Sequence, residues 1–199
     1  SILDEDDSVS IIADFLQQDD IAVQEDAKMR HQYSKIINLQ HFMHQYTSGY
    51  PRELTVHGEE LNAQTLKHIC AILMKGFTRE SISELYRNID DYEQLAELNR
   101  NGEVQNFIRM MSAARHYEKY KRQHNLVDFA DLLLYAYDTL KHGYSGKRYG
   151  WIQIDEVQDL NAMQLAIIDL LVADDDPMVM YLGDEQQAIF SFMGAKIEM

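Results

Sequence analysis

The sequence has little proline, cysteine and positive charge, and each shortage narrows the class of protein. Only two prolines occur in 199 residues, so long helices can run without interruption. The single cysteine, Cys70, has no intrachain partner and no metal-ligand spacing around it, and we expect it in a helical core. Lys and Arg number 18 against 33 Asp and Glu, a net charge of −15. That balance argues against a protein whose whole surface binds nucleic acid.

Long apolar runs are also missing. No run approaches the roughly 20 residues of a membrane-spanning helix, and no charged-then-apolar leader opens the chain. We therefore expect a cytoplasmic location and no membrane partner. One stretch opposes the overall charge, since residues 109–124 hold five basic side chains against Glu118 alone. The five are Arg109, Arg115, Lys119, Lys121 and Arg122. Both a DNA-contacting face and an ordinary solvated helix face fit this pattern.

Apolar residues recur at helical spacing over most of the first 140 positions, which predicts a mostly α fold there. Helices are expected over residues 8–17, 27–47, 63–75, 79–88, 92–99, 104–123 and 129–141. Helix-start signals support several of them, at Asn62, Thr78, Ser81, Asp128 and Asn161.

The pattern changes at residues 141–150, where three glycines and a serine indicate a loop. Short apolar runs at 151–154 and 178–182 flank a helical segment at 162–172, as in a βαβ unit with parallel strands. The sequence therefore predicts an α-helical part over 1–140 and a partial α/β segment over 141–199. Because two strands cannot form a stable sheet alone, either the α-helical part covers them or their neighbours lie outside these 199 residues. We expect the chain to be a piece of a larger protein.

Acidic side chains follow the first of these strands directly. Side chains at the carboxyl ends of parallel strands project into the ligand site of an open sheet. Asp155 could hold Mg²⁺ through coordinated water, and Glu156 could accept a proton from an attacking water. The alternative is that these acids, with Asp159, only precede and cap the next helix.

The second strand ends in a similar way, with Gly183 and Asp184. Gln187, a neutral donor and acceptor, could sense a γ-phosphate or orient water. Phe190 and Phe192 could stack on unpaired bases, although aromatic residues in such a place also fit a core.

These residues resemble the UvrD/PcrA/Rep-type DNA helicases of superfamily 1. "IQIDEVQDLNAMQ" is similar to their motif II, the Walker B element, and "GDEQQAIFSFMGA" to their motif III. "NLVDFADLLLYA" resembles the Asp-Phe-x-[Asp/Glu]-Leu-Leu motif ahead of motif II, and "SILDEDDS" the start of their helical insert. The resemblance implies a helical insert over 1–140, followed by a partial RecA-like motor segment.

The resemblance also implies roles for individual residues. Asp155 corresponds to the Mg²⁺-coordinating acid, Glu156 to the catalytic base and Gln187 to the γ-phosphate-sensing glutamine. Phe190 and Phe192 take the places of DNA-contacting aromatics. The residues that couple the nucleotide site to neighbouring motifs are Gln158, Asp159 and Asp184. The implied activity is ATP-dependent 3′ to 5′ movement on single-stranded or partly duplex DNA, with ATP, Mg²⁺ and the rest of the helicase chain as partners.

The sequence departs from the family pattern at Ala188, Phe190 and Met193, the last of which stands where an arginine is usual. No G-x-x-x-x-G-K-[ST] loop occurs in the 199 residues, so we expect this chain alone not to hydrolyse ATP. Two other interpretations remain open. One is a non-catalytic helical interaction module derived from a helicase, and the other is the motor part of a helicase–nuclease.

Overall fold

The chain forms two compact units, which are described separately. The computed structural model describes residues 1–18, 23, 25–51, 54, 63–92, 102–143 and 146–183. Unit 1 comprises Ser1–Tyr50 and Gly58–Phe129, and unit 2 comprises Pro51–His57 and Ala130–Met199. The division along the sequence falls after Phe129, whereas the sequence pattern placed it after residue 140.

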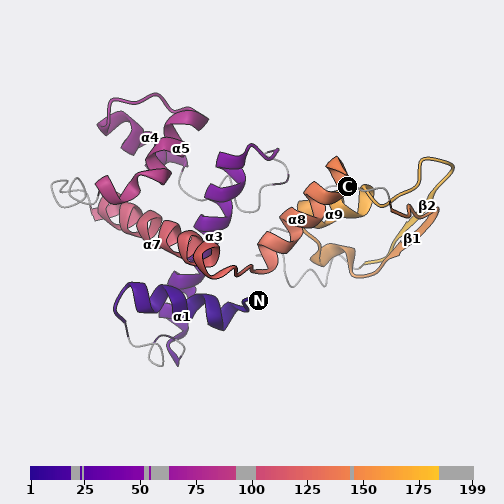
Figure 1. Ribbon diagram of the computed structural model, residues 1–199, viewed down its shortest axis with the longest axis horizontal. Helices are drawn as coiled ribbons and strands as arrows, with labels where there is room; N and C mark the ends of the chain where they lie inside the picture. Colours follow the sequence, from indigo (N-terminus) through magenta and orange to yellow (C-terminus); the bar gives the residue numbers. More distant parts are fainter. Residues whose placement is uncertain are drawn as a thin grey trace. The chain divides into compact units, whose positions relative to one another are not determined.

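Unit 1 is built from helices (Figure 1), and buried residues from these helices form one apolar core. Its helices are α1 (Glu5–Phe15), α3 (Ala27–Ser48), α4 (Ala63–Ile72), α5 (Arg79–Arg87), α7 (Gly102–His124) and the short 3₁₀ helix η2 (Ile89–Tyr92). The long helices α3 and α7 pack against each other, and α1 packs against both. Leu39, Met43 and Met111 are fully buried between them, and Cys70 is buried as expected.

Local signals define the helix ends in unit 1. Asp26 caps α3 by accepting hydrogen bonds from the backbone N–H groups of Lys28 and Met29. The same helix ends at Gly49, whose φ of 85° is a left-handed conformation that favours glycine. Thr78 caps α5 as the sequence predicted.

Some helix bounds differ from the expected ones. Helix α1 begins three residues earlier than predicted, because Asp4 and Asp7 form a reciprocal capping box at its start. Ser81 lies inside α5 and donates its backbone N–H to Thr78. The helix expected over 92–99 lies, after its first residue, outside the described residues, and so does the cap expected at Asn62.

Unit 2 contains a strand–helix–strand segment with parallel strands. Its elements are α8 (Phe129–His142), β1 (Trp151–Ile154), the 3₁₀ helix η3 (Val157–Asp159), α9 (Ala162–Asp169) and β2 (Met178–Tyr181). Strands β1 and β2 lie side by side in parallel, with Trp151 opposite Met178 and Ile154 opposite Tyr181 (Figure 1). Asn161 caps α9 in a capping box with Gln164. The predicted fold class, mostly α with a partial α/β segment, is confirmed.

The two strands of unit 2 expose large apolar side chains. Trp151 is 65% exposed, Met178 62% and Tyr181 52%. Parallel sheets are normally covered on both faces. The exposure of these side chains shows that the described part of unit 2 does not cover both faces of its strands. Separately, no described helix is both long and apolar enough to cross a lipid bilayer.

Candidate active site at the ends of the parallel strands

The carboxyl ends of β1 and β2 are held together beyond the strands themselves. The Leu182 N–H donates to the Ile154 carbonyl (2.8 Å), and the Val157 N–H donates to the Leu182 carbonyl (3.0 Å). Asp155 and Glu156 lie within this paired stretch, and Gly183 directly follows it. The structure thus brings the predicted acids to the edge where the second strand also ends.

Asp155 and Glu156 are both exposed at this edge. The Glu156 N–H donates to Asp155 Oδ1 (3.0 Å), which fixes one carboxylate against the backbone of the other residue. Glu156 adopts a left-handed backbone conformation, with φ 52° and ψ 42°. Such a conformation is costly for a side chain other than glycine and is common at functional sites.

Gln158 connects Glu156 to the end of the second strand. Its side chain is buried, at 2% exposure, and its Nε2 donates to Glu156 Oε2. A Cβ at Gly183 would lie 2.8 Å from Val157 Cγ1 and closer still to Gln158 Oε1. The absence of a side chain at Gly183 therefore makes room for the Gln158 amide. The coupling role that the resemblance implies for Gln158 stays a prediction.

Asp159 ends the 3₁₀ turn that follows the acids. Its Oδ1 is buried and has no hydrogen-bond partner within the described part of the chain. The side-chain metal ligands that the described residues of this edge offer are carboxylate and amide oxygens, which suit a hard cation such as Mg²⁺ held partly through water. Among the described residues, no group of three or more His, Cys, Asp or Glu side chains could enclose a metal alone. The Mg²⁺ site expected at Asp155 stays a prediction.

Four residues predicted for this site lie outside the described residues. They are Asp184, Gln187, Phe190 and Phe192. Their roles in phosphate sensing, DNA contact and coupling stay predictions. Gly183, whose missing side chain leaves space for the Gln158 amide, was noted in the sequence only as the end of the second strand.

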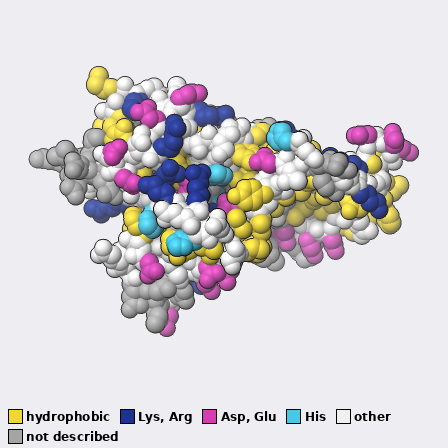
Figure 2. Space-filling view, viewed as in Figure 1, with side chains coloured by type: hydrophobic (Ala, Val, Ile, Leu, Met, Phe, Trp, Pro, Cys, Tyr) yellow, Lys and Arg dark blue, Asp and Glu magenta, His cyan; other side chains and the backbone are white. Residues whose placement is uncertain are grey.

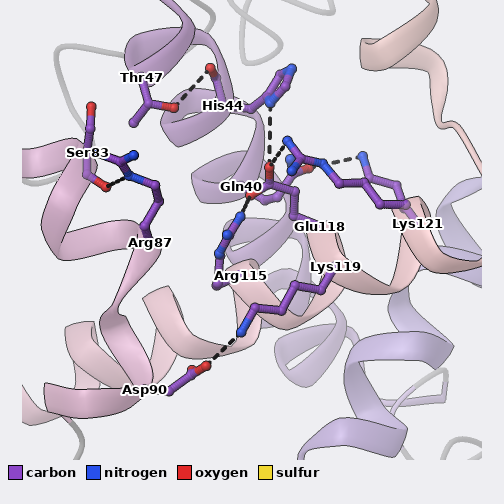
Figure 3. Close-up of polar contacts among 11 residues, drawn as sticks. Gln40, His44, Thr47, Ser83, Arg87, Asp90, Arg115, Glu118, Lys119 and Lys121 are labelled. Carbon is purple, nitrogen blue, oxygen red and sulfur yellow. Dashed lines mark hydrogen bonds and ion pairs between the residues drawn. The ribbon is translucent and has the colours of Figure 1, made fainter.

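The basic stretch of α7 is paired with carboxylates inside unit 1. Lys119 binds Asp90 (2.8 Å), Arg115 and Arg122 bind Glu118 (2.8 Å each), and Lys121 is buried against Asp128. Figure 3 shows Lys119 directed at Asp90 and Glu118 among its cationic neighbours. On the face seen in Figure 2, acidic and histidine side chains lie among the grouped Lys and Arg side chains.

Two of these carboxylates are buried and stay ionised. Burial opposes ionisation of Glu118, but hydrogen bonds from His44 and Arg115 and the charges of Arg115 and Arg122 lower its pKa to about 2. Burial likewise opposes ionisation of Asp128, but His41 and Lys121 hold the pKa of Asp128 far below its usual value. Most of the positive charge on α7 therefore serves to neutralise buried acids, which the sequence alone did not indicate.

A parallel strand–helix–strand segment with carboxylates directly after its first strand is typical of the α/β proteins that bind ligands at the carboxyl ends of their strands. The family model described as UvrD/REP helicase N-terminal domain matches residues 1–199, and the chain belongs to this family.

Individual relatives agree with that assignment. The chain is 36% identical over 89 residues to an ATP-dependent helicase/nuclease subunit of Carboxydothermus hydrogenoformans, covering 43% of this chain and 8% of that protein. It is 31% identical over 134 residues to the corresponding helicase/nuclease subunit of Natranaerobius thermophilus, covering 64% and 10%. It is 42% identical over 80 residues to DNA helicase II of Escherichia coli, covering 37% and 11%. These matches span about a tenth of each relative's length. No solved structure gives a significant match.

Proposed function

We propose that this chain is part of an ATP-dependent DNA helicase that couples ATP hydrolysis to 3′ to 5′ movement on single-stranded DNA. Unit 1 is its helical insert, and unit 2 carries motifs II and III of the first motor domain. The observation that carries the proposal is the Asp155–Glu156 pair at the paired ends of two parallel strands, in a chain that belongs to the UvrD/Rep family.

Each acidic or amide residue at the ends of the strands has its own role in ATP hydrolysis. Asp155 would hold Mg²⁺ through coordinated water, and this ion would supply positive charge beside the phosphates of ATP. Glu156 orients the attacking water and accepts its proton, while the hydrogen bond from Gln158 keeps the Glu156 carboxylate facing the site. Gln187 senses the γ-phosphate, and Phe190 and Phe192 stack on bases. Asp159 and Asp184 couple the nucleotide site to the neighbouring motifs. The phosphate-cradling loop comes from sequence beyond these 199 residues, so the isolated chain does not hydrolyse ATP.

The test is Glu156→Gln in the full protein that carries this sequence, assayed for DNA-stimulated ATP hydrolysis and strand displacement. We expect a loss of about 10²- to 10⁴-fold in hydrolysis, the usual contribution of a general base. The matched control is Asp175→Asn, which removes an exposed acid from a loop of the same unit. Unchanged hydrolysis in Glu156→Gln would contradict the proposal and favour the non-catalytic interaction module.

A second candidate is the motor part of a helicase–nuclease, favoured because two of the relatives are named as subunits of an ATP-dependent helicase/nuclease. The full protein would then degrade linear duplex DNA in an ATP-dependent manner. ATP-dependent strand separation without any degradation would exclude this candidate and leave the first.

A further inference from the structure

Asp128, the first residue of the Asp-Phe-x-Asp-Leu-Leu motif, collects three side-chain donors on one carboxylate oxygen. Its Oδ2 lies 2.6 Å from Lys121 Nζ, 2.9 Å from His41 Nε2 and 3.0 Å from the Tyr117 hydroxyl. Asp128 is 5% exposed and Lys121 4%. A carboxylate so deeply buried is retained only where several donors compensate for the lost water.

The donors come from the two long helices that form the centre of unit 1. His41 lies on α3, and Tyr117 and Lys121 lie on α7. Lys121 also donates to the buried Gln40 side chain of α3 (3.1 Å). Asp128 therefore joins the end of unit 1 to the packed α3–α7 pair with directional contacts from both helices.

A third helix is reached through Tyr117. The Tyr117 hydroxyl lies 2.8 Å from Ser8 Oγ on α1, and Ser8 Oγ lies 2.7 Å from the Asp4 carbonyl oxygen at the start of that helix. Each hydroxyl has a single proton, so with Tyr117 donating to Asp128 the Ser8 proton goes either to Tyr117 or to the Asp4 carbonyl. Ser8 thus places a polar contact of α1 against the tyrosine that binds Asp128.

The backbone beside Asp128 is paired with the first residues of the chain. The Leu3 N–H donates to the Val127 carbonyl (2.8 Å), the Val127 N–H donates to the Ser1 carbonyl (3.1 Å), and Ile2 and Val127 form a parallel bridge. Unit 1 ends at Phe129, one residue beyond Asp128. The first and last segments of unit 1 therefore lie side by side, and Asp128 fastens the last one.

We propose that Asp128 is a positioning residue, which clamps the paired first and last segments of unit 1 to helices α1, α3 and α7. The clamp makes unit 1 behave as one rigid body at the place where the chain continues into α8. Its functional consequence rests on the proposed helicase activity. In such a motor, a loose connection absorbs the movement that ATP hydrolysis generates, so ATP is consumed without strand separation.

The clamp itself is tested by amide hydrogen exchange in the full protein, resolved to peptides that cover residues 1–4 and 125–129. Asp128→Asn should speed exchange in these two peptides by at least about tenfold more than at the centre of α3, because the segments open locally in addition to any loss of global stability. Tyr117→Phe, which removes one hydroxyl and no charge, should act in the same direction more weakly. Asp90→Asn is the matched control, since it breaks an exposed ion pair between the same helix and another acid. Unchanged exchange, or a rise spread evenly over unit 1, would overturn the clamp.

The consequence is tested by the ratio of strand separation to ATP hydrolysis in the same variants. We expect DNA-stimulated hydrolysis within about twofold of the unsubstituted protein and several-fold fewer separated base pairs per ATP in Asp128→Asn and Tyr117→Phe. A parallel fall of both activities would show a purely stabilising role and overturn the coupling. If the unsubstituted protein shows no DNA-stimulated hydrolysis, both the proposed function and the coupling are overturned. The exchange measurement would still show whether Asp128 clamps the two segments.

Discussion

Lys121 Nζ lies 2.6 Å from Asp128 Oδ2, and both side chains are almost completely enclosed in the core of unit 1. Removing one member of such a pair leaves the other charge buried without compensation, which costs about 3–5 kcal/mol. Lys121→Met should therefore destabilise the protein by about that amount, measured by urea denaturation. Lys119→Met breaks the exposed pair with Asp90 and should cost about 1 kcal/mol or less. Equal losses in the two variants would contradict the burial argument.

Lowering the pH should destabilise unit 1, because Glu118 becomes protonated. The pKa of Glu118 is about 2 in the folded chain against an ordinary value of 4.5, so its ionised form stabilises the fold. That stabilisation is fully present above about pH 4.5 and is lost as the pH falls toward 2. Asp128, whose pKa is also lowered, acts in the same direction.

The pH effect is measured as the free energy of unfolding in urea between pH 5 and 2. Glu118→Gln should be less stable than the unsubstituted chain at pH 5 and should lose less stability over this range, because it has one fewer proton to bind. Equal slopes in both proteins would remove Glu118 from the account.

Gly183→Ala should disturb the edge that carries the acids. The new Cβ would meet Val157 Cγ1 at 2.8 Å and displace the Gln158 amide, and overpacking of this kind costs about 1–3 kcal/mol. With Gln158 displaced, Glu156 loses its hydrogen bond and the full protein should hydrolyse ATP more slowly. Gly150→Ala, before β1, is the control, because no heavy atom lies within 4 Å of its added Cβ. Equal rates of ATP hydrolysis in the two variants would show that the contact between Gly183 and Gln158 does not affect activity.

The capping box of α1 should have a measurable effect on stability. Asp4→Ala removes the side chain that accepts the Asp7 N–H (2.8 Å), and loss of such a cap costs about 1 kcal/mol. Asp14→Ala, at the other end of the helix, removes an acid that the helix dipole disfavours and should not destabilise. Thermal unfolding of both variants separates the cap from a general charge effect.

Local patterns were enough to predict most of the elements but not how the charges are arranged. The caps at Thr78 and Asn161 and the parallel strands at 151 and 178 follow from spacing and turn residues. Asp4 was missed as a cap because its partner is Asp7 and the pattern usually has Glu or Gln there. Lys121 looked like a surface charge, since lysine is seldom buried. Its inward position depends on His41 and Asp128, which are 87 residues apart and meet only in the folded unit.

The role of Glu156 in cleaving ATP is tested most directly by single-turnover hydrolysis of prebound ATP by the full protein with DNA present. Glu156→Gln should bind ATP within about threefold of the unsubstituted protein and cleave it at least about 10² times more slowly, because only the chemical step needs the base. A single-turnover rate equal to that of the unsubstituted protein would contradict the assignment of the acidic edge as the site of hydrolysis.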